Sequence, residues 1–388
     1  MIYFDHAATT FPKPPSVYAE VERCIRSYCG NPGRGSHTLS RAAAEKIYEC
    51  REEAASLFGL DAPENIVFTV NTTAALNMAI KGLLQQGDHV LISDMEHNSV
   101  LRPIDRLARE GRISYDIFPT HGGSGRIPTA EDICRGIGQR IRPETRAVVC
   151  AHASNICSAS LPIAEIGAFC HTNGLYLVVD GAQSAGILPL DMSRMGIDVL
   201  CVPGHKGLYG IQGSGMLLLS PGTVLDTLTE GGNGVRSLDA AMPDFSPERY
   251  ESGTLPTPAI AGLCEGIRFV KRVGTEAIMT HEQALFRRLR ELLTNTQGVK
   301  VYAPQFVGST LLFSVDGMPS DAVGRALDAR GFCVRCGFHC SALGHRTLGT
   351  PESGAVRASF GYFNRPAEVE RFYRALKEIL STAQKADR

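Results

Sequence analysis

Polar side chains with known chemical uses follow most of the apolar, β-rich segments of this sequence. Hydroxyl, amide, imidazole and carboxylate groups all occur at such segment ends. Because ligands in open α/β sheets bind beyond the carboxyl ends of the strands, we expect these groups to converge on one site. One polar strand end is common, but four in register are hard to explain by helix capping. The four ends are Asn71-Thr72-Thr73, Asp94 to Asn98 with His97 among them, His152 to Asn155, and Asp180 to Gln183.

Thr72 and Thr73 stand where a predicted strand runs into a predicted helix. The free N–H groups of a helix N-terminus attract anions, and the two hydroxyls add hydrogen-bond donors. This arrangement suits a phosphate group. A plain helix cap accounts for the same residue types, so these two interpretations stay open for this motif alone.

Lys206 alone of the eight lysines lies in a glycine-rich turn after a predicted strand, in Gly204-His205-Lys206-Gly207. Glycines permit close backbone approach, and burial lowers the pKa of an amine and frees it for Schiff-base chemistry. A solvated loop lysine is the alternative. Combined with a phosphate seat, the acid Asp180 and the aromatic His97, such an amine matches the needs of pyridoxal phosphate.

The elements that must position these groups alternate along the first two thirds of the chain. Short β-rich segments are separated by amphipathic stretches of helical length, which predicts a mainly parallel sheet with helices on both faces. The expected strands are 66–70, 90–93, 114–118, 147–151, 175–180, 199–202 and 215–219, and the helices among them are 74–84, 100–110, 130–141 and 163–172.

The pattern changes after Gly253 to a smaller α+β unit. We expect a large cofactor-binding domain from residues 14–258 and a small domain from residues 1–13 and 259–388. No long linker separates them, so they are expected to pack closely. The second unit should contain helices at 260–273, 276–293, 321–330 and 366–380, and strands at 299–302, 311–315 and near residues 333 and 356.

Composition argues against several classes of function. The chain has 388 residues with 39 basic and 40 acidic side chains, so no charge excess points to nucleic acid or to an anionic membrane. Its apolar runs are far shorter than the roughly 20 residues that span a bilayer, and the N-terminus MIYFDHAATT does not look like a signal peptide. The twelve cysteines are expected to be mostly buried, reduced thiols, which favours the cytoplasm.

The sequence resembles the class V aminotransferase family of fold-type I pyridoxal-phosphate enzymes, and within it the SufS-like branch of cysteine desulfurases and selenocysteine lyases. The resemblance implies a large domain with a seven-stranded, mainly parallel sheet flanked by helices and a smaller α+β domain that carries a catalytic cysteine. The segments that carry it are 3–10, Arg34 to His37, Glu96-His97, Asp180 to Gln183, Gly204 to Lys206, Arg335 to Cys340 and 357–364.

The resemblance also implies a role for each matched residue. Lys206 would bind the cofactor as an imine, Asp180 would pair with the pyridine nitrogen, and His97 would stack on the ring and help to move protons. Cys340 would take sulfur from L-cysteine as a persulfide, leaving L-alanine, for delivery to an acceptor protein as in iron–sulfur cluster assembly. Gln183 would contact the ring hydroxyl; Thr72, Thr73 and His205 would hold the phosphate together with Thr254 from the partner subunit of a homodimer; and Asn155, Arg357, Arg335 and His37 would form the substrate site.

Two positions depart from the pattern of the branch. Pro203 stands where Ser is usual, so one phosphate hydroxyl is expected to be missing. Cys336 stands where Thr or Ala is usual, and it either handles sulfur together with Cys340 or is a small buried residue. Arg335, His339 and His345 are expected to favour the thiolate form of Cys340 by their charge.

Other functions compete with this one. A selenocysteine lyase would use the same site, whereas transamination or kynureninase-like C–C cleavage would not need the thiol of Cys340. A carrier that binds the cofactor without turnover is opposed by the complete set of reactive residues. The non-enzymatic alternative is a metal site, because the spacing of Cys333, Cys336, His339 and Cys340, with His345 beyond, suits zinc or a cluster. Positive charge from Arg335 and Arg357 argues against that alternative.

Overall fold

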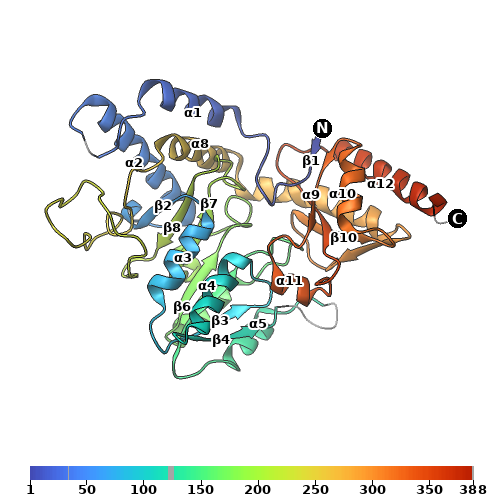
Figure 1. Ribbon diagram of the computed structural model, residues 1–388, viewed down its shortest axis with the longest axis horizontal. Helices are drawn as coiled ribbons and strands as arrows, with labels where there is room; N and C mark the ends of the chain where they lie inside the picture. Colours follow the sequence, from blue (N-terminus) through green and yellow to red (C-terminus); the bar gives the residue numbers. More distant parts are fainter. Residues whose placement is uncertain (34, 121–125, 387–388) are drawn as a thin grey trace.

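The computed structural model describes residues 1–33, 35–120 and 126–386 (Figure 1). Its centre is a seven-stranded sheet with the order β2-β8-β7-β6-β5-β3-β4. The edge pair β2 and β8 is antiparallel, as is β8 with β7, and the remaining pairs are parallel. The expected mainly parallel sheet is therefore confirmed. Its strands are β2 (Ile66–Thr69), β3 (His89–Ser93), β4 (Ser114–Phe118), β5 (Thr145–Ala151), β6 (Tyr176–Asp180), β7 (Val199–Pro203) and β8 (Gly215–Leu219).

Helices cover both faces of this sheet (Figure 1). The four expected helices form within a few residues of their predicted ends, as α3 (Thr72–Leu83), α4 (Asn98–Arg109), α5 (Ala130–Gly138) and α6 (Ile163–Thr172). Further helices that the sequence pattern did not assign are α1 (Pro15–Ser27), α2 (Thr38–Phe58) and the short α7 (Met192–Met195). Both α1 and α2 pack against α8 (Thr257–Val273).

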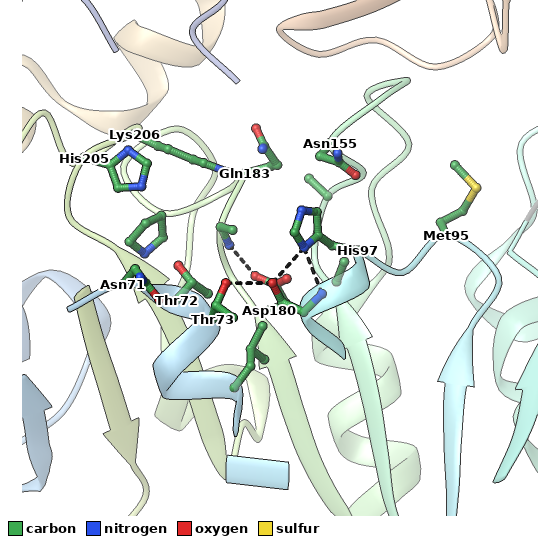
Figure 2. A pocket seen from close by; sticks show the side chains of 16 residues that line it. Asn71, Thr72, Thr73, Met95, His97, Asn155, Asp180, Gln183, His205 and Lys206 are labelled. Atoms are coloured by element: carbon green, nitrogen blue, oxygen red, sulfur yellow. Dashed lines mark hydrogen bonds between the residues drawn. The ribbon is translucent and has the colours of Figure 1, made fainter. Parts of the chain in front are cut away.

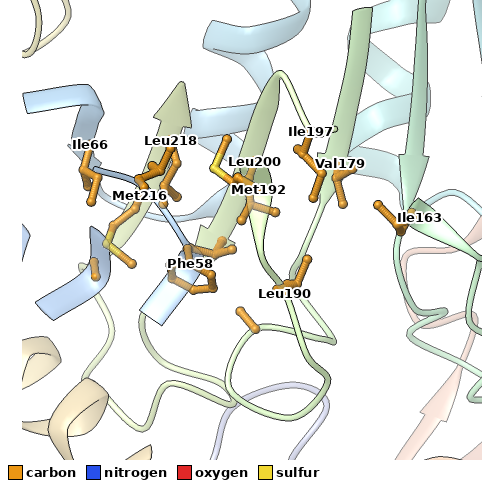
Figure 3. Close-up of a cluster of buried hydrophobic side chains, with 14 of the residues drawn as sticks. Phe58, Ile66, Ile163, Val179, Leu190, Met192, Ile197, Leu200, Met216 and Leu218 are labelled. Carbon is orange, nitrogen blue, oxygen red and sulfur yellow. The ribbon is translucent and has the colours of Figure 1, made fainter. Parts of the chain in front are cut away.

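Apart from the half-buried edge strand β4, the strands are largely buried on both faces, which explains their apolar sequences. Successive side chains point to opposite faces of a strand. Val178 thus joins the cluster under α3 and α4, while Val179 joins the cluster on the other face. Figure 3 shows part of the second cluster, where Phe58 of α2 packs against the sheet near Leu200 and Met216. The two cores hold the strand ends, and the loops that follow them, in fixed positions.

The smaller unit is built on an antiparallel sheet with the order β12-β13-β10-β9. The N-terminal strand β1 (Ile2–Tyr3) pairs in parallel with β11 (Phe332–Cys333), so the start of the chain lies against this unit. The sheet strands are β9 (Val299–Tyr302), β10 (Thr310–Val315), β12 (Arg335–Gly337) and β13 (Ala355–Ser359), and the helices are α9 (Thr275–Thr294), α10 (Ser320–Asp328), α11 (Ala342–Thr347) and α12 (Pro366–Ala386).

The division into two domains stays a proposal, and the packing of α8 refines its boundary. Ile260, Leu263 and Ile267 of this helix are buried in the core of the large sheet. We therefore propose that the large domain extends to the end of α8 instead of ending at residue 258. Across the described ranges, no helix is both long and apolar enough to cross a membrane.

Candidate active site

A pocket with about 530 Å³ of empty space opens at the carboxyl ends of the parallel strands. In Figure 2, Lys206 and His205 approach it from one side and His97 and Asn155 from the other, with Asp180 and Thr73 between them. The predicted convergence of polar strand ends is thus confirmed as geometry. Among the predicted site residues, Thr72, Thr73, His97, Asn155, Asp180, Gln183, His205 and Lys206 line this pocket.

Lys206 lies in the turn after β7, and the carboxylate of Asp180 ends β6 beside it. Burial lowers the pKa of the Lys206 amine to about 8; Asp180 opposes this shift, while Arg357 and Arg335 add to it. Burial raises the pKa of Asp180, whose Oδ1 accepts a hydrogen bond from Ala182 N at 2.9 Å. The pocket therefore holds an amine that readily becomes neutral, next to a desolvated acid.

The turn around Lys206 depends on a glycine at position 207. A Cβ atom there would collide with the carbonyl oxygen of Ala185. The turn is held further by Lys13, whose Nζ donates to the carbonyl of His205 at 2.8 Å and to Thr10 Oγ1 at 2.6 Å. Lys13 is buried, and burial lowers the pKa of its amine to about 7. Sequence analysis missed this contact, because nothing in the spacing places residue 13 beside residue 205.

The start of α3 does not use the Thr72 hydroxyl as its helix cap. The cap is Asn71, whose Oδ1 accepts a hydrogen bond from Ala74 N at 2.9 Å, so the Thr72 hydroxyl is not needed for capping. Thr72 Oγ1 and His205 Nδ1 are buried without a hydrogen-bond partner, and both line the pocket. Buried polar groups are normally paired. Acceptor oxygens of a phosphate would pair them, so these residues fit a phosphate-bearing cofactor.

His97 caps α4 with its own ring. Its Nδ1 accepts a hydrogen bond from Ser99 N at 3.0 Å, so in the neutral ring the proton sits on Nε2. Ser99 Oγ lies 2.9 Å from the same nitrogen and 2.8 Å from Thr73 Oγ1. Burial, aided by the charge of Lys206, lowers the pKa of His97 to about 4. A neutral aromatic ring therefore faces the pocket. Ser99, which sequence analysis missed, orients it.

Arg357 and Asn155 meet at the junction of the two units. Arg357 is 1% exposed, and its guanidinium donates to Asp5 Oδ1 at 2.7 Å and to the Asn155 carbonyl at 3.0 Å. Its Nε is buried without a partner. Asp5 was not among the predicted site residues, although it lies in the N-terminal segment that carries part of the resemblance. A buried arginine with one N–H unpaired can bind a further carboxylate.

Cys340 lies in an exposed turn between β12 and α11. His339 and Cys340 both adopt left-handed backbone conformations, with φ of 50° and 54°, which non-glycine residues rarely adopt. Two contacts hold the turn against the segments that follow β3 and β5: Asn98 N donates to the Cys340 carbonyl at 2.8 Å, and Asn155 Nδ2 donates to the His339 carbonyl at 2.8 Å. Arg335 Nη2 lies 3.7 Å from Cys340 Sγ.

The expectation that His339 and His345 favour a thiolate by their charge is wrong. Both rings are buried and face each other, with His339 Nδ1 3.1 Å from His345 Nε2. Burial lowers the pKa of both imidazoles, that of His339 to about 3, so neither carries charge near neutral pH. Of the three side chains, Arg335 is the one with a contact to the thiol, with Nη2 3.7 Å from Sγ. Spacing in the sequence could not distinguish rings that face the thiol from rings that face each other.

Cys336 points away from Cys340. It neighbours Arg335 on β12, and its side chain packs into the small-domain core beside Gly324 of α10. Burial raises the pKa of its thiol to about 11, which makes it a weak nucleophile. Within the described part of the chain, no three His, Cys, Asp or Glu side chains are placed to hold a metal ion. The metal-site alternative therefore gains no support.

Besides Arg335, Cys340 and Arg357, two further predicted site residues do not line the pocket of their own chain. His37 is exposed and caps α2 by accepting a hydrogen bond from Ser40 N at 3.3 Å. Thr254 is exposed in the turn that follows Glu251. Their roles remain predictions, and Arg34 of the same motif as His37 lies outside the described residues.

Comparisons with known proteins agree with this geometry. The sequence model of the family described as "Aminotransferase class-V" matches residues 2–372. The chain is 32% identical to a "Probable cysteine desulfurase" of Methanothermobacter thermautotrophicus, covering 97% of this chain and 94% of that protein. It is 30% identical to one of Pyrococcus abyssi, covering 98% and 95%. The apo structure of a cysteine desulfurase from Thermococcus onnurineus NA1 superposes with a TM-score of 0.88 at 30% identity, covering 98% of this chain and 95% of that chain.

Proposed function

The chain belongs to the class-V aminotransferase family, and on that basis we propose that it is a pyridoxal-phosphate-dependent cysteine desulfurase. It converts L-cysteine to L-alanine and keeps the sulfur on Cys340 as a persulfide. The observation that carries the proposal is the joint anchoring of two reactive groups. The Lys206 amine lies in the pocket, and the turn that bears Cys340 is hydrogen-bonded to Asn98 and Asn155, which follow β3 and β5 of the same sheet.

Pyridoxal phosphate, when bound at Lys206, supplies an electron sink that stabilises negative charge at the substrate α-carbon. Thr72 Oγ1 and His205 Nδ1 hold its phosphate at the N-terminus of α3, where both atoms otherwise lack partners. Asp180 is the acid available to a pyridine nitrogen, and Gln183 is the amide available to a ring hydroxyl. Gln183 is already oriented, because its Nε2 donates to the Ala7 carbonyl at 2.9 Å.

Proton movement falls to Lys206 and His97. The lowered pKa of Lys206, about 8, lets the amine accept a proton from the substrate near neutral pH. The neutral His97 ring presents its Nε2–H side to the pocket, because Nδ1 is occupied by Ser99. This orientation suits a ring that stacks on the cofactor and donates a hydrogen bond.

The substrate carboxylate binds at Arg357, whose Nε still lacks a partner, and at Asn155. This places the substrate sulfur toward the turn of Cys340. The thiolate of Cys340 attacks that sulfur. The new S–S bond forms as the Cβ–S bond breaks, and the electron pair left on carbon is protonated to give alanine. Arg335, 3.7 Å from Sγ, favours the thiolate.

The chain acts as a homodimer in this proposal. The turn Ser252-Gly253-Thr254 does not line the pocket of its own chain, and Thr254 is exposed. It is therefore available to add a hydroxyl to the phosphate site of a partner subunit. The reaction leaves sulfur on an exposed cysteine, which suits transfer to an acceptor protein, as in iron–sulfur cluster assembly. All twelve cysteines are free, which fits a reducing compartment such as the cytoplasm.

The test of this function is incubation of the purified, cofactor-loaded protein with L-cysteine and, separately, with L-selenocysteine, measuring alanine and the reduced chalcogen. A desulfurase forms alanine and sulfide from L-cysteine in the presence of a reducing thiol. Turnover of L-selenocysteine alone would reassign the protein as a selenocysteine lyase. Formation of a keto acid without alanine would reassign it to transamination.

A further inference from the structure

A buried chain of hydrogen bonds runs from Thr350 through His345 to His339, the residue before Cys340. Thr350 Oγ1 lies 2.7 Å from His345 Nδ1, and His345 Nε2 lies 3.1 Å from His339 Nδ1. His339 Nε2 lies 3.2 Å from the carbonyl oxygen of Arg335. These three side chains are 1%, 1% and 3% exposed, respectively. None of them lines the pocket or contacts the thiol, so the proposed mechanism does not use them.

The direction of every bond in this chain follows from its last member. A carbonyl oxygen only accepts hydrogen bonds, so His339 Nε2 must carry a proton and donate a hydrogen bond to the carbonyl of Arg335. In a neutral ring His339 Nδ1 is then an acceptor, which requires a proton on His345 Nε2. His345 Nδ1 becomes an acceptor in turn and receives the hydroxyl proton of Thr350. Both rings are thereby fixed as Nε2–H tautomers.

Protonation of His339 would break this chain of hydrogen bonds, because its new Nδ1–H would point at the Nε2–H of His345. Burial, together with the positive charges of Arg357 and Arg335, holds the pKa of His339 at about 3. Burial also lowers the pKa of His345, against the opposing effect of a hydrogen bond to the backbone of Thr350. The chain of hydrogen bonds therefore stays intact at pH values around 7. Its geometry is constant at the pH where the proposed reaction would run.

The chain of hydrogen bonds ends at Arg335, which in turn contacts Cys340. Arg335 accepts the bond from His339 with its carbonyl and contacts Cys340 Sγ with its guanidinium. His339 and Cys340 themselves have the left-handed backbone conformation of this turn. Such a conformation persists only where surrounding contacts hold it. Asn155 and Asn98 hold this turn by the carbonyls of His339 and Cys340. The His339 ring adds a third contact, to the carbonyl of Arg335.

We propose that Thr350 and His345 are positioning residues for the sulfur-accepting thiol: acting through His339, they fix the Arg335–Cys340 turn so that Sγ stays beside the guanidinium. The proposal rests on the proposed role of Cys340. It gives a function to a pair of residues that lie beyond the reactive turn and touch neither substrate nor cofactor.

The test compares four substitutions in the cofactor-loaded enzyme. His345→Phe keeps the ring shape and removes both nitrogens, and Thr350→Val removes only the hydroxyl. Thr350→Ser restores the hydroxyl. Thr347→Val is the matched control, because it removes a hydroxyl from the same helix, one that donates to the Asp94 carbonyl at 3.0 Å and lies outside the chain. The measurements are kcat and KM for L-cysteine, the rate at which iodoacetamide alkylates Cys340 at neutral pH, and the cofactor spectrum.

We expect His345→Phe to lower kcat by about 10- to 100-fold, since misplacement of a reacting atom by about 1 Å has effects of this size. KM and the cofactor spectrum should stay unchanged, because the pocket is intact. Thr350→Val should act in the same direction with a smaller effect. Thr350→Ser and Thr347→Val should resemble the parent. The alkylation rate of Cys340 should fall by about two- to five-fold, because Arg335 would no longer face the thiol and an exposed charge contact contributes up to about 1 kcal/mol. The rest of the loss in kcat comes from misplacement of Sγ.

A parental kcat and alkylation rate in His345→Phe would overturn the proposal, as would a Thr350→Ser variant as impaired as Thr350→Val. If His345→Phe does not fold, the comparison of valine with serine at position 350 decides. Nitrogen-15 chemical shifts of labelled histidines add a direct readout, expected to give Nε2–H tautomers at both rings. If the parent forms no alanine from L-cysteine, the proposed function fails, whereas the alkylation rates and chemical shifts still test the positioning.

Discussion

Arg335 and Cys340 face each other across the turn that follows β12, with Nη2 3.7 Å from Sγ. A positive charge at this distance favours the thiolate, the reactive form of the side chain. The site is exposed, and exposed charge contacts contribute up to about 1 kcal/mol. Replacing Arg335 by Met should therefore slow the alkylation of Cys340 by iodoacetamide about two- to five-fold.

Arg335→Lys is the matched variant, because it keeps the charge on a shorter reach and should lie between Met and the parent. The cofactor spectrum should not change in either variant, which separates an effect on the thiol from an effect on the pocket. Equal alkylation rates in all three proteins would show that Arg335 does not activate Cys340.

The lowered pKa of Lys206 predicts how the apo protein takes up its cofactor. The amine reacts with an aldehyde only when neutral, and its pKa of about 8 lies below the ordinary 10.5 of lysine. The neutral fraction therefore rises as the pH passes through about 8. Imine formation with pyridoxal phosphate, followed by absorbance, should speed up with a midpoint near that pH. A rate that keeps rising toward 10.5 would contradict the burial of this amine, and Lys206→Ala should form no imine in the pocket.

We expect a substitution of Pro203 to strengthen the binding of pyridoxal phosphate. It ends β7 opposite Gly215, lines the pocket, and offers no side-chain donor to a phosphate. Pro203→Ser adds one hydroxyl, and a hydrogen bond to a charged group contributes about 1.5–3 kcal/mol. We expect the Kd of pyridoxal phosphate to fall about ten-fold. Pro203→Ala controls for loss of the ring; if it binds the cofactor as tightly as the serine variant, the hydroxyl is not the cause.

Cys336 should be dispensable for sulfur transfer. Its side chain packs beside Gly324 in the small-domain core, and burial raises the pKa of the thiol to about 11. Cys336→Ala should keep the parental rates of alanine formation and of sulfur release. A small loss of thermal stability is expected, because the substitution leaves a cavity. A Cys336–Cys340 disulfide found by mass spectrometry in the oxidised parent would refute this placement.

The sequence was sufficient to predict the large sheet and the pocket that it positions. All seven expected strands form, and the polar ends after β2, β3, β5 and β6 meet in one pocket with Lys206. Apolar runs and polar strand ends are local features, so they can be recognised before the fold is known. The helices α1 and α2 were not assigned, although α2 buries Phe58 against the sheet. Their apolar and charged residues alternate as in an amphipathic helix, so the pattern was present in the sequence and these two helices could have been predicted.

Contacts between segments that are distant in the sequence could not be predicted from the sequence. Asp5 pairs with Arg357, 352 residues away, and Lys13 with the His205 carbonyl, 192 residues away, and spacing carries no signal for such pairs. The charged role expected of His339 and His345 failed for the same reason. Their proximity to Cys340 in sequence was real, but burial made both rings neutral and turned them toward each other.

The central claim is that sulfur from L-cysteine is transferred to Cys340. The most direct measurement is mass spectrometry of the alkylated peptide that contains residue 340, after one round of reaction with L-cysteine, in the parent and in Cys340→Ala. We predict one added sulfur atom on Cys340 in the parent, and in the variant no alanine formed while the cofactor spectrum is retained. Alanine formation at the parental rate by Cys340→Ala, or the added sulfur on another cysteine of the parent, would contradict the account.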